Sequence, residues 1–66
     1  MKVLVNGREQ EVDGAVTVEG LLERLHLRAQ YALVERNGAP VERARYGEVG
    51  LEEGDRLVVV RAVAGG

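Results

Sequence analysis

The chain has 66 residues, which is room for one small domain. It has no Cys, one His and only two aromatic residues, so the fold must be stabilised by packing of Val, Leu and Ala, without disulfides or a metal. The net charge is −2 and the basic residues are scattered, which argues against a nucleic-acid partner.

A β-hairpin is predicted at the N-terminus. Residues 2–5 are rich in Val and Leu, as in a strand, and Asn6-Gly7 follows at once. Asn-Gly is the favoured pair of a type I′ turn, because both of its central positions need a positive φ. We expect the partner strand at residues 8–13. It is mostly polar, which suits the edge of a sheet.

An amphipathic helix is predicted next. Thr17 is a good N-cap, because its hydroxyl can accept a hydrogen bond from a free N–H of the first turn. Val18, Leu21, Leu22 and Leu25 then recur at i, i+3, i+4 and i+7. This spacing places them on one face of a helix, which we expect to pack across one side of the sheet.

The second half of the chain predicts three more strands. Residues 31–36 form the first, but residues 31–34 are apolar on both faces, so its orientation is ambiguous. A second Asn-Gly turn at residues 37–38 leads to a short strand or arm at residues 39–42, which Pro40 places at an edge. The turn Gly54-Asp55 then begins the last and most apolar strand, from residue 57 onwards.

The first and last strands are the most apolar, so we expect them to be central and adjacent. By the alternation of side chains along a strand, four residues should face the helix: Val3, Val5, Leu57 and Val59. Three should face away from it: Leu4, Val58 and Val60. The latter are either a docking site for a partner or ordinary exposed apolar residues, and the pattern does not decide between the two.

Residues 52–55 contain three carboxylates and form an acidic turn. It is interpreted either as a solvated loop or as a docking charge for a basic partner.

The inventory of side chains excludes most enzyme chemistry. The chain has no Cys or Ser, Thr17 has its only aliphatic hydroxyl, and His26 lies beside the apolar helical stripe. No Gly-rich phosphate loop and no cluster of metal ligands is present. We therefore predict a protein that is not an enzyme, with no catalytic residue, no metal site and no bound cofactor.

The last two residues, Gly65-Gly66, are the most informative feature. They follow the last strand without a polar spacer. Gly has no Cβ, so these residues can thread a narrow channel in a partner enzyme. A terminal carboxylate offered in this way could be adenylated and then attacked by sulfur or nitrogen. We expect a domain at residues 1–64 and a flexible Gly-Gly tail at residues 65–66.

Over its whole length the chain resembles the ThiS family, the sulfur carriers of thiazole formation in thiamine biosynthesis. The resemblance rests on several landmarks taken in order: Asn6, Thr17-Val18 before Leu21-Leu22, residues 32–37, residues 41–43, Leu51 with Gly54-Asp55, and residues 63–66. It implies an α+β fold of the ubiquitin-like β-grasp type, a mixed four- to five-stranded sheet with one helix packed across one face.

The resemblance also implies a mechanism. A ThiF-like enzyme would use ATP to adenylate Gly66, and sulfur from a cysteine desulfurase would convert it to a thiocarboxylate. The thiocarboxylate would give its sulfur to a ThiG-like thiazole synthase. Gly66 is then the modified residue, and five others would bind the partners: Gly65, Ala64, Ala62, Val60 and Val58.

Four alternatives stay open. The chain also resembles MoaD, the small subunit of molybdopterin synthase, and a sulfur carrier for tRNA thiolation is not excluded. A ubiquitin-like modifier joined to protein lysines, or a TGS-like interaction module, would use a similar fold. An interaction module would not need the Gly-Gly end.

The expected location is the cytoplasm. The chain shows no basic segment followed by an apolar one, as a signal peptide would. Its longest apolar run, residues 57–60, is far too short to span a bilayer, so no membrane partner is expected.

Overall fold

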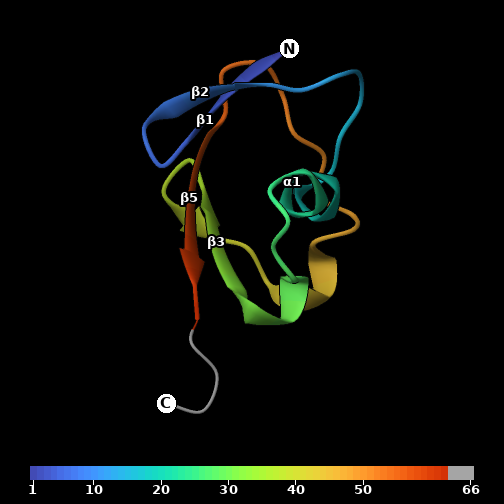
Figure 1. Cartoon of the computed structure of the whole chain (residues 1–66), viewed down its shortest axis with the longest axis vertical. Coiled ribbons are helices and arrows are strands. Elements are labelled where there is room, and N and C mark those ends of the chain that lie inside the picture. Colours follow the sequence, from blue (N-terminus) through green and yellow to red (C-terminus); the bar gives the residue numbers. More distant parts are fainter. Residues whose placement is uncertain (63–66) are drawn as a thin grey trace.

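A computed structural model describes residues 1–62 of the chain. Its elements, in chain order, are β1 (Lys2–Val5), β2 (Arg8–Glu11), α1 (Val18–Arg24), η1 (Ala29–Tyr31), β3 (Ala32–Arg36), β4 (Ala39–Pro40), η2 (Arg43–Arg45) and β5 (Arg56–Arg61), where η marks a 3₁₀ turn. The five strands form one sheet in the order β2-β1-β5-β3-β4. In the described part of the chain, α1 lies on one side of this sheet and no helix covers the other (Figure 1).

The sheet is mixed, because β1 and β5 run parallel while the β1–β2, β3–β4 and β3–β5 pairs are antiparallel. The predictions that the first and last strands are central neighbours and that the polar second strand is at an edge are confirmed. The second strand ends at Glu11, two residues earlier than predicted, and Gly14 turns the chain away with a φ of +59°.

Both predicted Asn-Gly turns are confirmed. Asn6 and Gly7 have φ angles of +52° and +83°, and Asn37 and Gly38 have +53° and +87°. These are the positive values that a type I′ turn requires at both central positions.

Helix α1 begins as predicted, because the Thr17 hydroxyl accepts a hydrogen bond of 3.1 Å from the Gly20 N–H. The helix ends in a Schellman motif centred on His26, whose φ is +60°. The His26 N–H donates to the Glu23 carbonyl at 3.0 Å, and the Leu27 N–H donates to the Leu22 carbonyl at 2.9 Å. The lone His is therefore an exposed helix-end residue.

The core lies between α1 and the helix-facing side of the sheet. The predicted inward residues of β1 and β5 are all buried, as are three of the four apolar helix residues, whereas Leu25 is half-buried. Tyr46 was not predicted to belong to the core, yet it is 2% exposed, and its hydroxyl donates to the Ala32 carbonyl at 2.7 Å. Its ring contributes the largest fully buried side chain of the domain.

Candidate functional site

Three large apolar side chains lie exposed on the side of the sheet that α1 leaves uncovered. Leu33, Val58 and Val60 are 53%, 47% and 51% exposed, and we refer to them as the outer patch. In the β3–β5 register Leu33 lies directly opposite Val60, and Val58 lies opposite Glu35. The sequence-predicted residues Val58 and Val60 therefore share one surface, as expected from strand alternation.

A hollow of about 330 Å³ adjoins this patch. Its lining includes the outer patch together with Pro40 and Val41, which follow β3 along the chain. Strand β4 has only two residues. The short β4 leaves a largely apolar depression that can receive an apolar side chain of a partner protein.

Strand β5, which carries Val58 and Val60 of the outer patch, is held in place by the side chains of both turn asparagines. The Asn6 amide donates to the Val59 carbonyl at 3.0 Å and accepts from the Val59 N–H at 2.8 Å. Asn37 accepts from the Arg56 N–H at 2.9 Å. The sequence indicated these residues only as turn formers. No local sequence pattern reveals that their side chains also form hydrogen bonds with the backbone of β5.

The strand is also held at its far end. The Ala62 N–H donates a hydrogen bond of 2.6 Å to the Tyr31 carbonyl, and Ala62 is half-buried. The remaining predicted site residues, Ala64, Gly65 and Gly66, lie outside the described residues, as does the predicted domain boundary after Ala64. The structure thus fixes the course of the chain up to the fourth residue before Gly66.

Leu33 was missed as a site residue. Its segment is apolar at consecutive positions, so strand alternation could not assign a face to it. The pairing with β5 settles the question, because Ala32 and Val34 are buried and Leu33 points outward.

The interpretation of the acidic turn is wrong for Asp55, which is neither solvated nor available for docking. This residue is 6% exposed. Its carboxylate accepts hydrogen bonds from Arg36 Nε at 2.8 Å, the Glu52 N–H at 2.8 Å and the Asn37 amide at 3.0 Å. Burial acts to raise the pKa of Asp55, but these hydrogen bonds outweigh it and hold the pKa below its usual value. Asp55 therefore stabilises the fold.

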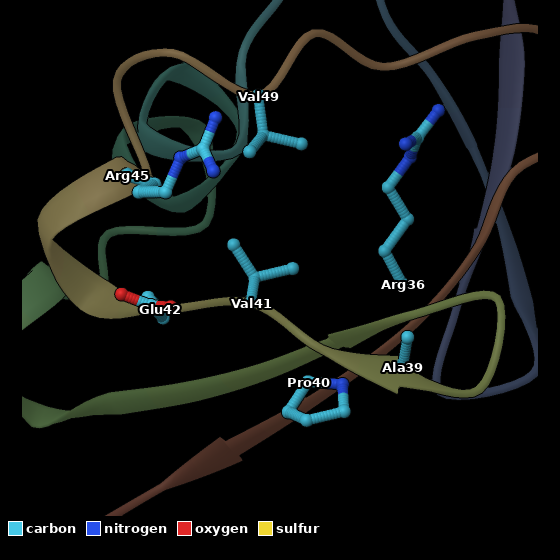
Figure 2. Close-up of a pocket in the computed structure, with 7 residues that line it drawn as sticks. All are labelled: Arg36, Ala39, Pro40, Val41, Glu42, Arg45 and Val49. Atoms are coloured by element: carbon cyan, nitrogen blue, oxygen red, sulfur yellow. The ribbon is translucent and has the colours of Figure 1, made fainter.

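A second hollow, of about 290 Å³, lies between β4 and the segment around η2. Figure 2 shows Val41 and Val49 at its centre, with Arg45 on one side and Arg36 on the other. Arg36 pairs with Asp55 and Glu52, and Arg45 lies 3.9 Å from Glu48. Carboxylates of the chain itself already balance both arginines, so this hollow is a weak candidate for a binding site.

The described residues offer little catalytic chemistry of their own. Among residues 1–62, no group of three or more His, Asp or Glu side chains could hold a metal ion. The Thr17 hydroxyl is engaged as the helix cap. No helix in this range is long and apolar enough to cross a membrane. The cytoplasmic location stays a prediction.

The matching family model and the similar solved structures agree on one family. The ThiS family matches residues 3–66, a range that includes the Gly-Gly end. Among solved structures, the crystal structure of the thiamine biosynthesis protein ThiS from Geobacter metallireducens shares 33% identity over the full length of both chains, with a TM-score of 0.82. An NMR structure of a thiamine biosynthesis protein from the same organism has a TM-score of 0.80 over 88% of its length and all of this chain. These matches confirm the predicted β-grasp fold.

Two curated relatives carry a different name. The chain is 41% identical over 66 residues to a thiazole synthase of Magnetococcus marinus and 36% identical to one of Paramagnetospirillum magneticum. All of this chain is matched in each case, but it spans only about a fifth (20%) of the length of either relative.

Proposed function

This chain belongs to the ThiS family, and we propose that it is a sulfur carrier for thiazole formation in thiamine biosynthesis. In this role it is a protein substrate of its partner enzymes and performs no catalysis itself. The observation that carries the proposal is the family match over residues 3–66, because it includes the two glycines on which the chemistry depends.

The proposed reaction takes place at Gly66. A ThiF-like enzyme joins the Gly66 carboxylate to the adenylyl group of ATP and releases pyrophosphate. Persulfide sulfur that originates from a cysteine desulfurase then displaces AMP to give an acyl disulfide, and a thiol reductant cleaves its S–S bond, which leaves a thiocarboxylate on Gly66 and a new disulfide on the reductant. ATP is bound by the activating enzyme in this scheme, so the carrier itself needs no cofactor.

The sulfur acceptor that we propose is a ThiG-like thiazole synthase. The whole chain resembles a fifth (20%) of each of two proteins that are named thiazole synthase. A carrier-like segment is therefore part of the same polypeptide as the rest of those proteins, which supports a direct partnership. The names of the solved structures also favour thiamine biosynthesis over molybdopterin synthesis or tRNA thiolation.

The outer patch is the surface that we assign to these partners. It consists of apolar side chains that are about half exposed, next to a hollow of about 330 Å³, on β5, which leads to Gly65-Gly66, and on the neighbouring strand β3. Apolar residues clustered at the centre of an interface commonly carry most of its binding energy. A partner that covers Leu33, Val58 and Val60 would be aligned with the chain end that it modifies.

The test is intact and fragment mass spectrometry of the protein before and after incubation with a ThiF-like enzyme, ATP, cysteine, a desulfurase and a thiol reductant. Replacement of one oxygen by sulfur adds about 16 Da, nominally the same as oxidation of Met1 to its sulfoxide. The C-terminal fragment must therefore carry the change, and we expect it on Gly66.

The matched control is Gly66→Ala, which adds one methyl group to a residue outside the described range. This variant should fold normally but lose adenylation. If the folded wild-type protein gains no mass on Gly66 while the enzymes modify a known carrier, the proposal is wrong. Modification of Gly66→Ala at the wild-type rate would contradict the threading of the Gly-Gly end.

A further inference from the structure

A cationic pocket lies at the end of β5, on the helix-facing side of the sheet. It has a volume of about 360 Å³ and is lined by His26, Leu27, Arg28, Tyr31 and Arg61. Arg28 and Arg61 are both exposed. Two guanidinium groups and an imidazole, from the loop between α1 and η1 and from β5, therefore surround one open space with an apolar wall.

The local charge differs from that of the whole chain. The net charge is −2, yet no Asp or Glu occurs between Arg24 and Val34 or after Asp55. Arg43 adds another guanidinium nearby, because its Nε donates to the Ala29 carbonyl at 3.1 Å. Arg24, Arg36 and Arg45 have carboxylate partners, whereas within residues 1–62 neither Arg28 nor Arg61 forms an ion pair.

The position of the pocket connects it to the outer patch. Arg61 lies opposite the buried Ala32 and points to the helix side, whereas Val60 lies opposite the exposed Leu33 and points to the outer side. The carbonyl of Tyr31, a pocket residue, accepts the hydrogen bond from the Ala62 N–H. A protein that surrounds the chain where β5 ends would meet an apolar surface on one side and cations on the other.

We propose that this pocket docks acidic side chains of the thiazole synthase that receives the Gly-Gly end, an inference that rests on the proposed function. Aspartate or glutamate on the synthase would pair with Arg28 and Arg61 while its apolar residues cover the outer patch. The two contacts together would fix the direction in which the chain end enters the synthase.

An acidic partner fits this pocket better than a small anion does. The arginines are exposed, and ion pairs at such sites contribute little in open water. They gain strength when a protein surface covers them and excludes water, and they also accelerate the encounter of oppositely charged proteins.

The experiment measures the affinity of the full-length chain for the thiazole synthase of the same organism by calorimetry. Arg28→Glu is the informative variant, because Arg28 lies in the loop before η1 and belongs neither to β5 nor to the outer patch. Arg8→Glu on the edge strand β2 makes the same change of net charge outside the pocket. Circular dichroism melting establishes that both variants are folded.

We expect Arg28→Glu to weaken binding about tenfold, and Arg8→Glu to change it by less than about twofold. Raising the salt from about 0.1 M to about 1 M shortens the Debye length from ~10 Å to ~3 Å. This change should lower the affinity of the wild type for the synthase more than it lowers the affinity of Arg28→Glu. Equal affinities of the two variants, with equal salt dependence, would overturn the pocket proposal alone. A wild type that neither binds the synthase nor is modified on Gly66 would overturn the proposed function and this inference with it.

Inorganic phosphate serves as the competing ligand. NMR of the Arg28 and Arg61 side chains should show no saturable shift with phosphate in the millimolar range. Saturable phosphate binding, together with a normal affinity of Arg28→Glu for the synthase, would identify a small-anion site and contradict the acidic partner.

Discussion

The side-chain amide of Asn6 pairs with the backbone of Val59 through one donated and one accepted hydrogen bond, of 3.0 Å and 2.8 Å. Asn6 lies just beyond the end of β1, where the chain has already turned with a φ of +52°. The parallel backbone pairing of β1 with β5 covers Leu4 and Val5 opposite Arg56 and Leu57. The Asn6 amide extends this pairing to Val59, between the two valines of the outer patch.

The Asn6–Val59 pair leads to the first prediction. Asn6→Asp keeps the shape and the oxygen acceptor but replaces the NH₂ donor by a carboxylate oxygen that faces the Val59 carbonyl. The partly buried carbonyl then loses its partner, and we expect the free energy of unfolding to fall by about 1–3 kcal/mol. Urea denaturation measures this loss, and hydrogen exchange should accelerate at the Val59 amide.

Asn6→Gly is the control for the turn, since glycine accepts the positive φ but has no amide. It should lose a similar amount of stability. If both variants unfold within about 0.5 kcal/mol of the wild type, the size of an ordinary surface substitution, the amide does not hold β5.

The two Asn-Gly turns also mark the limit of what the sequence could predict. The turns themselves follow from local chemistry, because few residues other than Asn and Gly adopt a positive φ readily. The bonds from Asn6 to Val59 connect residues 53 positions apart, and they depend on a strand register that no local pattern contains. Asp55 was misinterpreted for the same reason, because two of its three partners, Arg36 and Asn37, come from the β3–β4 turn region.

The candidate site was predictable to a similar degree. Val58 and Val60 follow from alternation along an obviously apolar strand, and the structure places both on the exposed face. Leu33 and the hollow beside it could not be predicted, because residues 31–34 are apolar at every position. The cationic pocket could not be predicted either, since its residues come from the loop after α1, the η1 turn and β5.

A second prediction concerns the dependence of stability on pH. Because hydrogen bonds hold the folded-state pKa of Asp55 below its ordinary value, its ionised form stabilises the fold. This contribution is present in full above the unfolded-state pKa of about 3.9, and is lost as the pH falls through the lower folded-state pKa. The free energy of unfolding should therefore decline as the pH falls below about 4.

Asp55→Asn removes this titration, so its stability should be lower than that of the wild type at neutral pH and should change less with acid. Asp13→Asn removes a carboxylate that is 91% exposed and should keep a wild-type slope. If the free energy of unfolding of the wild type and that of Asp55→Asn fall equally as the pH is lowered, protonation of Asp55 does not cause the loss of stability in acid.

The end of α1 gives a third prediction. His26 has a φ of +60°, a conformation that costs a residue with a Cβ about 1 kcal/mol or more and costs glycine almost nothing. Glycine is also more flexible in the unfolded chain, which offsets part of the gain. We expect His26→Gly to stabilise the protein by about 0.5 kcal/mol, a rise in melting temperature of about 2–4 °C.

His26→Ala separates the backbone effect from the loss of the imidazole. Alanine keeps the Cβ, so His26→Ala should not raise the melting temperature above that of the wild type. A melting temperature for His26→Gly below that of His26→Ala would mean that the left-handed conformation at the helix end is not strained.

The fourth prediction tests the outer patch. Val60→Glu places a charge on the exposed face directly opposite Leu33, beside the largely apolar hollow. Because Val60 is half exposed (51%), the glutamate can reach water in the isolated protein, and the loss of stability should stay within about 1 kcal/mol, the span of strand propensities. In a complex that covers the patch, the same charge would be buried without a partner, which is costly.

We therefore expect sulfur loading of Gly66 to fall at least about tenfold in Val60→Glu at low carrier concentration. Ala15→Glu adds the same charge at an exposed position before α1 and should be loaded normally. If Val60→Glu is loaded as fast as Ala15→Glu at all concentrations, the activating enzyme does not bind the outer patch, and the alignment of the Gly-Gly end must come from another surface.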